Sequence, residues 1–356
     1  MKAVTIRNSG IDDQLEAVVE TRPLPKLRAG YFLVKVMAVA INPADLLVLD
    51  FKMAVPGSLA GCDYAGTVVE LGSDVQRDFK LGDRVCGCTR STDPAQFENG
   101  TFAEYIVVKA DLQLRIPSGM GFEQAASLGV TTLTTGRFIL EDGSVNTSKQ
   151  NPRQILVYGG SSAMGTMVIQ FAKLANFTVL TTSAPHNADL VRSYGADFVV
   201  DHYSPDAPAE LLAIAKKNAL ALGPLTLCVD NISRADSAAF CAKVLAPQDE
   251  TQQSDVLYSV LTPLTPPLPG ITTLPTVGYS FLGEEYEFMG QVVPASTEDF
   301  ERARRFAVVA ERLLQLGHVK PHPVDVRTGG LEGVVKTGLP ELRNGKVSGK
   351  KLVYVM

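Results

Sequence analysis

The stretch that decides the fold is Gln154–Ser183, QILVYGGSSAMGTMVIQFAKLANFTVLTTS. Its residues 155–158 form a short apolar run, which is typical of a strand buried on both faces. Two glycines then interrupt the run, and apolar residues recur at roughly helical spacing over residues 164–174. A second β-rich run closes the stretch. The pattern predicts a strand, a glycine turn, a helix and a second strand, which is a βαβ unit of the size that binds dinucleotides.

Residues 160–165, GSSAMG, resemble the phosphate-binding fingerprint G-x-G-x-x-G, with a serine in place of the central glycine. The N-terminus of the following helix would favour an anion, because its backbone N–H groups are unpaired there. An ordinary glycine turn is the alternative, but the flanking strand and helix favour a nucleotide. We interpret the central serine as a hydroxyl directed at the phosphates. The predicted phosphate-binding residues are Gly160, Ser161, Ser162, Ala163 and Met164.

Length and composition indicate a globular protein of two domains. The chain has 356 residues, of which 46% are hydrophobic and 20% charged, with a formal net charge of −5. An acidic balance argues against nucleic acid or an acidic membrane surface as a partner. Five scattered cysteines, a first segment that enters a strand directly and the lack of a long apolar run predict a cytoplasmic protein with reduced thiols.

The first part of the chain reads as mostly β, with short strands separated by glycine and proline. The expected strands are 3–7, 17–21, 32–41, 64–71 and 101–108. A helix is expected to start at Glu123, followed by a polar loop or insertion over 141–153. The C-terminal residues 345–355 read as a turn and a final strand, which we expect to return to the first domain.

Strands and helices alternate after the opening unit, which predicts a parallel sheet covered on both faces. The expected helices are 188–194, 209–219, 235–245 and 298–317, and the expected strands are 198–201, 226–230 and 256–261. The proline-rich segment 261–275 cannot form a central strand, because proline donates no hydrogen bond to a ladder. We expect a first domain over 1–125, completed by about 281–356, and a nucleotide-binding domain over 126–280.

Several motifs together resemble the medium-chain dehydrogenase/reductase superfamily over nearly the whole chain. They are Asn42-Pro43-Ala44-Asp45, the segment GCDYAG at 61–66, the turn VYGGS at 157–161, Pro185-His186-Asn187 and the terminal SGKKLV at 348–353. The sequence is similar to the zinc-free, quinone-reductase-like branch. Within it, the sequence most resembles the fungal trans-acting enoyl reductases that partner polyketide synthases, of the lovastatin enoyl reductase type.

The resemblance implies an α/β fold, with a GroES-like β-rich catalytic domain and a Rossmann domain built on a doubly wound parallel sheet. It implies hydride transfer from NADPH to the β-carbon of an α,β-unsaturated thioester. That thioester would be a polyketide chain held by the acyl carrier protein of a partner synthase. Further cofactor contacts are implied at Asn42, Pro43, Ala44, Asp45, Leu47, Leu261, Val347 and Ser348.

A bound metal is not expected. A catalytic zinc needs about three Cys, His or carboxylate ligands. Zinc-dependent relatives place a cysteine near Asn42 and a His-Glu pair near 62–63, where this sequence has Asn-Pro and Cys-Asp. Cys86 and Cys88 are a single C-x-C pair, which cannot close a structural zinc site. An enoyl thioester is already activated at its β-carbon, so its reduction needs no Lewis acid.

The expected cofactor is NADPH. An NAD site usually carries an acidic residue about 20 residues after the glycines, whereas residues 181–187 read TTSAPHN. This acid-free segment would suit a 2′-phosphate, bound by Ser183, Ala184, His186 and Asn187, while Arg192 reads as a solvated helix charge. Relatives supply a tyrosine from the next strand end. Here His202 has the matching position and Tyr203 the matching residue type, so both remain candidates.

The proton donor is left open by the sequence. The related enzymes carry a lysine two residues after the NPxD-type aspartate, but this position is Leu47. Tyr64 is a candidate donor by its chemistry, with barrel packing as the alternative for its side chain and bulk water as the alternative donor. Thr134 matches a nicotinamide-pocket position. The acyl-chain pocket is predicted to involve Thr134, Phe138, Glu141, Gly278, Tyr279, Ser280, Phe281 and Leu282.

The prolines at 266–269 would blunt a sheet edge that pairs with its twin in many relatives, which predicts a monomer. Two other functions are also compatible with the sequence. One is a quinone or enone reductase acting on free small molecules. The other is a non-catalytic NADPH-binding partner protein, which the missing lysine and the missing central glycine keep open.

Overall fold

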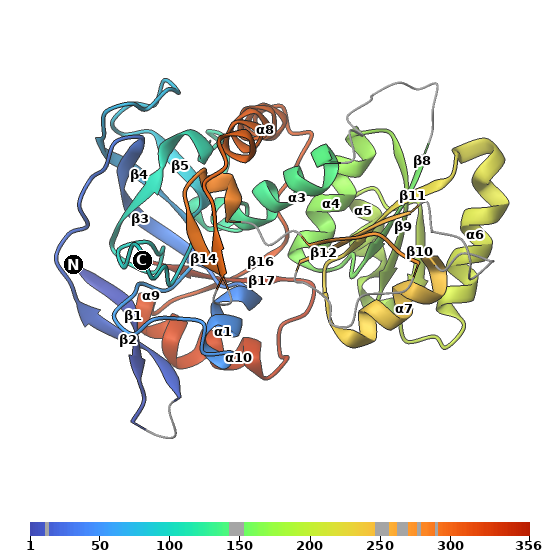
Figure 1. The fold of residues 1–356 in the computed structure, drawn as a ribbon, viewed down its shortest axis with the longest axis horizontal. Helices are drawn as coiled ribbons and strands as arrows, with labels where there is room; N and C mark the ends of the chain where they lie inside the picture. The colour runs from blue at the N-terminus through green and yellow to red at the C-terminus, as the bar shows by residue number, and fades with distance from the viewer. Residues whose placement is uncertain (11–13, 142–152, 246–255, 262–269, 276–278, 289–290) are drawn as a thin grey trace. The chain divides into compact units, whose positions relative to one another are not determined.

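The fold was analysed in a computed structural model, which describes residues 1–10, 14–141, 153–245, 256–261, 270–275, 279–288 and 291–356. The chain divides into two compact units (Figure 1). Unit 1 comprises Met1–Leu133 and Tyr279–Met356, and unit 2 comprises Thr134–Gly278. The sequence placed the corresponding boundaries after residues 125 and 280. Most of the polar loop expected at 141–153 lies outside the described residues.

Unit 1 is built on a seven-stranded sheet of the order β16-β17-β3-β4-β5-β7, with β6 also paired to β3, in the described part of the chain. Its strands are β3 (Tyr31–Ala40), β4 (Asp63–Leu71), β5 (Arg84–Cys88), β6 (Tyr105–Lys109), β7 (Leu114–Arg115), β16 (Val324–Arg327) and β17 (Lys351–Val355). Alternate residues of β3, β4, β6 and β17 are buried in one apolar core that includes Phe32, Tyr64 and Tyr354.

The return of the C-terminus to the first domain is confirmed. Strand β17 lies antiparallel to β3, with Val353 opposite Ala40, and parallel to β16. The strand expected over 101–108 is shorter than predicted, because residues 102–103 pair elsewhere. Val4 donates to the carbonyl of Phe102 at 2.7 Å, and Ala103 bridges Ala3. Strand β6 therefore begins only at Tyr105.

Two hairpins and several helices complete unit 1. The hairpins are β1 (Lys2–Asn8) with β2 (Leu15–Thr21), and β14 (Tyr286–Phe288) with β15 (Gln291–Val293). The α-helices are α1 (Pro43–Asp50), α2 (Phe122–Ala125), α8 (Thr297–Gln315), α9 (Gly330–Gly333) and α10 (Leu339–Arg343). Short helical turns are η1 (Ala110–Leu112), η3 (Ser280–Leu282) and η4 (Val334–Gly338).

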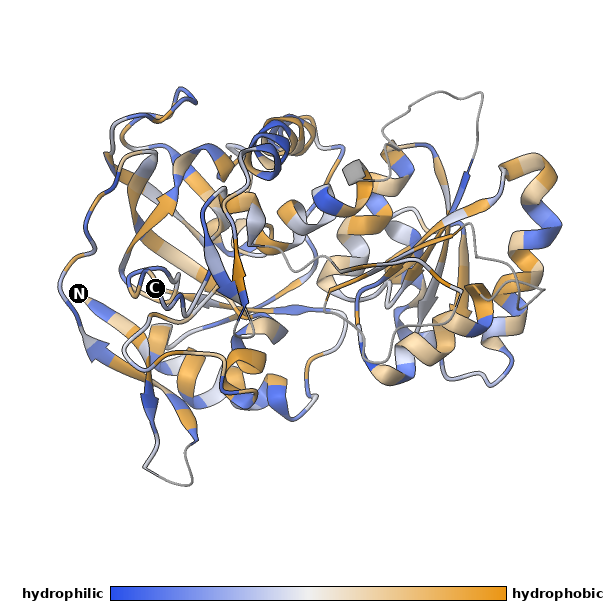
Figure 2. Ribbon diagram, in the orientation of Figure 1, coloured by the Kyte–Doolittle hydropathy of each residue, from blue (hydrophilic) through white to orange (hydrophobic). Residues whose placement is uncertain are grey.

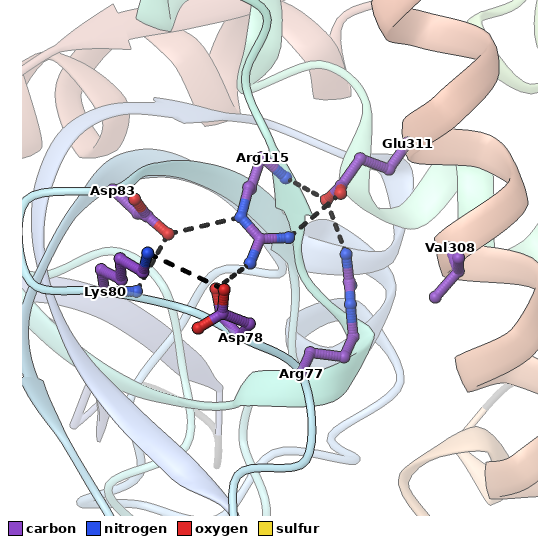
Figure 3. A pocket seen from close by; sticks show the side chains of 7 residues that line it. All are labelled: Arg77, Asp78, Lys80, Asp83, Arg115, Val308 and Glu311. Atoms are coloured by element: carbon purple, nitrogen blue, oxygen red, sulfur yellow. Dashed lines mark hydrogen bonds and ion pairs between the residues drawn. The ribbon is translucent and has the colours of Figure 1, made fainter.

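Helix α8 is attached to the barrel by a network of charges. Glu311 on α8 accepts hydrogen bonds from Arg77 at 2.6 Å, and from the backbone and side chain of Arg115 (Figure 3). Arg115 also pairs with Asp83, and Lys80 pairs with Asp78. The six charged side chains that line this surface hollow are thus matched in sign. The charged side chains around the hollow therefore pair with one another and attach α8 to the barrel.

Unit 2 is an open parallel sheet of the order β10-β9-β8-β11-β12-β13 in the described residues. Its strands are β8 (Arg153–Tyr158), β9 (Phe177–Ser183), β10 (Phe198–Asp201), β11 (Leu225–Asp230), β12 (Leu257–Val260) and β13 (Thr273–Pro275). Figure 2 shows these strands as mainly hydrophobic, as expected for a sheet covered on both faces. The strand order reverses at β8 and β11, where sheets of this class bind ligands beyond their carboxyl ends.

The helices of unit 2 follow the predicted alternation. They are α4 (Ala163–Leu174), α5 (Ala188–Ser193), α6 (Ala207–Leu222) and α7 (Ala235–Leu245), while α3 (Gly129–Glu141) begins in unit 1 and ends in unit 2. Helices α6 and α7 share an apolar core with the sheet, and α4 and α5 lie on its other face (Figure 1). The α/β class and the doubly wound sheet are confirmed.

The proline segment was predicted not to form a central strand. Its described end, β13, is the edge strand of the sheet and terminates at Pro275. Residues 262–269 lie outside the described residues. None of the described helices is long and apolar enough to cross a membrane.

Candidate functional site

The glycine turn of unit 2 has the shape that the fingerprint predicts. Gly159 follows β8 with a φ of +75°, which strongly favours glycine. A Cβ added at Gly165 would lie 2.3 Å from the carbonyl oxygen of Gly159, and one at Gly160 would lie 2.1 Å from Thr181 Oγ1. Both glycines of the fingerprint are therefore required by close packing between the turn, α4 and β9.

Ser162 caps the helix that follows the glycine turn. It is the N-cap of α4, where its Oγ accepts a hydrogen bond from the backbone N–H of Gly165 at 3.0 Å. The same hydroxyl donates to the carbonyl of Gly159 at 2.8 Å. Both interactions close the turn, and the expected contact of this hydroxyl with the phosphates stays a prediction. A serine is a preferred N-cap, which explains its presence without a ligand.

The other predicted cofactor residues of unit 2 follow the carboxyl ends of neighbouring strands. Ser183 ends β9, where its hydroxyl donates to Ala184, and the helical turn η2 (Pro185–Asn187) comes next. Leu261 follows β12 and donates its N–H to Ser233 Oγ at 2.7 Å. Because the strands are parallel, these segments lie at the same end of the sheet as the glycine turn, namely the end where the strands have their carboxyl termini.

His202 and Tyr203 follow β10 at this carboxyl-terminal end of the sheet. Their ring centroids lie 4.0 Å apart with the ring planes tilted by 36°, and 72% of Tyr203 is exposed. The two rings lie side by side, so a cofactor contact from either residue stays a prediction.

The predicted cofactor residues of unit 1 begin helix α1. The backbone N–H of Asn42, the N-cap, donates to Asp45 Oδ2 at 2.8 Å, and Pro43 occupies the first turn. Leu47 is 40% exposed on the same helix. Val347 and Ser348 precede β17, with Val347 half-buried against the core and Ser348 exposed.

Asp63 is the centre of a buried polar network that the sequence did not reveal. Its Oδ2 forms an ion pair with Lys351 Nζ at 2.5 Å and accepts from Asn42 Nδ2 at 3.1 Å. Its Oδ1 accepts from the backbone N–H of Val130, in the first turn of α3, at 2.6 Å. Asp63 and Lys351 are both buried. One carboxylate therefore holds together β4, β17, the start of α1 and the start of α3.

Gly129 makes this network possible. A Cβ at this position would lie 2.5 Å from Asp63 Oδ1 and 2.1 Å from the carbonyl oxygen of Gly87. Only glycine lets the first turn of α3 approach the carboxylate so closely. The buried position of Lys351 had no sequence signal, because its segment SGKKLV reads equally well as an exposed turn into a strand.

Tyr64 packs in the core, which was the alternative considered for it. Its side chain is fully buried on β4, and its hydroxyl donates to Gln113 Oε1 at 3.1 Å. Burial raises the pKa of this phenol well above its usual value. A phenol whose hydrogen is used inside the barrel is unsuited to protonating a substrate, so we withdraw it as a candidate donor.

The predicted acyl-chain residues lie on two elements. Thr134 is half-buried and Phe138 is buried on α3. Tyr279 and Phe281 are half-buried, whereas Ser280 and Leu282 are buried, around the turn η3. The side chain of Glu141 and all of Gly278 lie outside the described residues. Substrate contacts at these positions stay predictions.

The five cysteines of the chain are free and buried. Cys86 and Cys88 both lie on strand β5, so they serve as packing residues of the barrel. Among the described residues, no group of three or more His, Cys, Asp or Glu side chains is arranged to hold a metal ion.

Two buried groups near Lys351 titrate with opposite effects on stability. Burial, assisted by the Lys351 ammonium, lowers the pKa of His322 to about 4. Because the unfolded chain takes up this proton near pH 6.5, stability is lost as the pH falls from 6.5 towards 4. Burial raises the pKa of Asp45 to about 7. The folded chain takes up that proton first, so stability is gained as the pH falls from 7 towards 4.

Replacing His322 by glutamine is expected to separate these two effects. The variant keeps the Asp45 contribution and loses the His322 contribution. As the pH falls from 6.5 to 5, its free energy of unfolding should therefore rise by about 2 kcal/mol relative to that of wild type, because the limiting slope is about 1.4 kcal/mol per pH unit. Urea denaturation of both proteins at the two pH values measures this difference. An equal difference at both values would contradict it.

Comparisons with known proteins agree with this architecture. The family model described as the alcohol dehydrogenase GroES-like domain matches residues 28–118. Among solved structures, an alcohol dehydrogenase superfamily protein from Novosphingobium aromaticivorans superposes over the full length of both chains with a TM-score of 0.75, at 19% identity. A mycobacterial protein in complex with NADPH superposes over both full chains with a TM-score of 0.71, at 18% identity. These likenesses establish the fold, that of the medium-chain dehydrogenase/reductases.

Curated relatives are considerably more similar in sequence. The trans-enoyl reductase resD of Aspergillus sclerotiorum is 38% identical over 95% of this chain and 96% of its own length. The trans-enoyl reductase ACTTS2 of Alternaria alternata is 36% identical over 99% of both chains. With its GroES-like barrel, its doubly wound sheet and full-length similarity of this degree, the chain belongs to the fungal trans-enoyl reductase family of the medium-chain dehydrogenase/reductases.

Proposed function

We propose that this protein is a trans-acting enoyl reductase. It reduces the α,β-unsaturated thioester of a polyketide chain that is held by the acyl carrier protein of a partner polyketide synthase. The observation that carries the proposal is the full-length similarity to proteins named trans-enoyl reductases, at 38% and 36% identity. The structure supports it with a glycine turn at the reversal point of a parallel sheet.

The residues at the carboxyl-terminal end of the unit 2 sheet fit a dinucleotide with a 2′-phosphate. The turn at 159–162 brings backbone next to the N-terminus of α4, where a diphosphate would be bound without side-chain charge. Residues 183–187, at the end of β9, contain a serine, a histidine and an asparagine but no carboxylate that would repel a phosphate. We therefore propose NADPH as the cofactor, which supplies the hydride when it is bound.

The chain's own residues have two tasks in this reaction. Asn42 and the start of α1 are fixed by Asp45 and Asp63, so that the unit 1 cofactor residues keep one geometry. Unit 1 residues 279–282 would contact the acyl chain. After hydride has been added to the β-carbon of this chain, its α-carbon still requires a proton. Leu47 offers no proton in the place where the sequence resemblance expected a lysine.

The proposal is tested by following NADPH oxidation at 340 nm. The substrates are an enoyl pantetheine thioester, with and without a reducing polyketide synthase that lacks a working reductase domain, and a free quinone. Turnover of the thioester but not of the quinone supports a trans-acting enoyl reductase. Quinone turnover alone would assign the chain to the small-molecule reductases. Tight NADPH binding without turnover on either substrate would indicate a non-catalytic partner protein.

We also propose that the protein is monomeric. In the part of the chain that the structure describes, one edge strand of the unit 2 sheet is β13, which is three residues long and ends at Pro275. A short edge strand with proline discourages pairing with a second sheet. Size-exclusion chromatography with light scattering at micromolar concentration should give the mass of one chain, 38.1 kDa. A dimer mass would contradict the proposal.

A further inference from the structure

Tyr279 is the first described residue of the predicted acyl-chain segment and carries a hydroxyl for which the described residues show no hydrogen bond. Its carbonyl accepts from the N–H of Leu282 at 3.0 Å, which closes the turn η3, and η3 packs against α8. The side chain is half-buried. The backbone at Tyr279 is thus held in place while its hydroxyl is free to meet a ligand.

The ring of Tyr279 packs against the guanidinium of Arg90, whose Cζ lies 5.1 Å from the ring centroid. Arg90 is buried and is itself held by the carbonyl of Glu287, to which Nη2 donates at 2.7 Å. The ring of Tyr286 lies 5.4 Å from the same Cζ and meets the Tyr279 ring edge-on, with centroids 5.9 Å apart. Two aromatic rings therefore enclose one buried cation.

One nitrogen of the Arg90 guanidinium, Nη1, has no hydrogen-bond acceptor among the described residues. Its Nη1 lies 3.5 Å from Asp93 Oδ1, which is within ion-pair distance, but it makes no hydrogen bond within the described part of the chain. Asp93 is already engaged by Asn99 at 3.0 Å and by the backbone of Ala95. A buried donor without a hydrogen bond is uncommon, and it is consistent with a partner that arrives with the substrate.

The charges around the Tyr279 hydroxyl suit a proton donor. Burial raises the pKa of its phenol above the usual value, as do the nearby Cys62 and Asp45, while Arg90 opposes the rise. The phenol therefore carries its proton throughout the neutral range, and Arg90 would stabilise the phenolate that is left after donation. Asp45 belongs to the start of α1, so the charge of the unit 1 cofactor segment acts on the Tyr279 phenol.

We propose that Tyr279 is the catalytic acid of the reduction and that Arg90 is its positioning residue. This inference rests on the proposed function. After the β-carbon has received hydride, the electron pair of the resulting enolate forms the new C–H bond at the α-carbon with the Tyr279 hydrogen. The O–H bond of the phenol breaks, and its electron pair stays on the phenolate oxygen, while the Arg90 guanidinium lies against the ring. A proton from solvent then restores the phenol. Tyr279 thus takes the task for which Leu47 and Tyr64 are unsuited.

The test compares Tyr279→Phe with Tyr286→Phe. Each variant removes one hydroxyl and keeps the ring beside Arg90, so the pair separates chemistry from packing. With an α-methyl enoyl pantetheine thioester and NADPH, Tyr279→Phe is expected to lower kcat about 100-fold, the lower range for losing a general acid. Wild type should yield one configuration at the α-carbon, and Tyr279→Phe a mixture, because water then protonates either face. Tyr286→Phe should retain both the rate and the configuration.

A second readout needs no cofactor. In protein labelled with ¹³C at tyrosine Cζ, the saturated thioester product should shift the Tyr279 resonance, assigned by its loss in Tyr279→Phe, and leave that of Tyr286 in place. Arg90→Met should abolish the shift, and Arg90→Lys should restore part of it together with part of the rate.

The outcomes distinguish the two proposals. If wild type reduces the thioester and Tyr279→Phe matches it in rate and product configuration, the assignment of Tyr279 is wrong and the proposed function stands. If wild type binds NADPH but reduces no enoyl thioester, even with a partner synthase, the proposed function fails. The assignment of Tyr279 then fails with it.

Discussion

Replacing Asp63 by alanine is expected to lower the free energy of unfolding by about 3–5 kcal/mol, because it leaves the Lys351 ammonium buried and unpaired. Both side chains of the pair are almost fully buried. The same change also removes the acceptor of Asn42 Nδ2 and of the Val130 N–H. Urea denaturation at pH 7, with the slope m checked for constancy, measures the loss.

Two control variants show whether the loss comes from the buried charge. The double variant Asp63→Ala/Lys351→Met should recover part of the stability, since removing both partners leaves no unpaired ion. Glu332→Ala breaks the exposed pair with Lys336 and should change stability by at most about 1 kcal/mol. If Asp63→Ala behaved like Glu332→Ala, the network would not be holding the four elements together.

Replacing Gly165 by valine is expected to abolish NADPH binding and to destabilise unit 2. The new Cβ would lie 2.3 Å from the carbonyl oxygen of Gly159 and 2.6 Å from Gly160 Cα. These are backbone atoms that cannot rotate away, so the turn must open. Overpacking of this kind costs about 1–3 kcal/mol or more. Opening the turn would also remove its backbone contacts with the diphosphate, and each 1.4 kcal/mol of binding free energy lost in this way weakens the NADPH affinity tenfold.

NADPH fluorescence titration, together with urea denaturation, measures both effects. Gly119→Val is the matched control, because a Cβ at Gly119 would meet no atom within 4 Å. It should bind NADPH as wild type does. Undiminished NADPH binding by Gly165→Val would place the cofactor somewhere other than the glycine turn.

Local patterns predicted most of the elements, because each element depends on neighbours in sequence. The helix at 235–245 and the strand at 198–201 were predicted with the bounds that the structure has. Helix α6 extends a few residues beyond the prediction at both ends, since Pro208 is tolerated in its first turn. The strand predicted from residue 101 begins at 105, because residues 102–103 pair with the N-terminal strand, a contact without a local signal.

The role of a polar side chain was harder to predict than its position. Ser162 was placed correctly in the turn, but an N-cap and a phosphate ligand require the same residue type, so the sequence could not separate them. Tyr64 likewise has the chemistry of an acid, and only its burial and its bond to Gln113 show that it packs in the barrel.

By itself, the sequence determined the glycine turn, the alternation of strands and helices that makes a doubly wound sheet, and the lack of a carboxylate at residues 183–187. Each of these is decided by residues within one βαβ unit, so it can be read locally. Only the tertiary structure decided that Asp63 meets Lys351, and that Arg90 meets Tyr279. The members of these pairs are far apart in the chain. Asp63 and Lys351 are buried together because the C-terminal strand joins the sheet of unit 1. Arg90 meets Tyr279 because residues 279–287 pack against it.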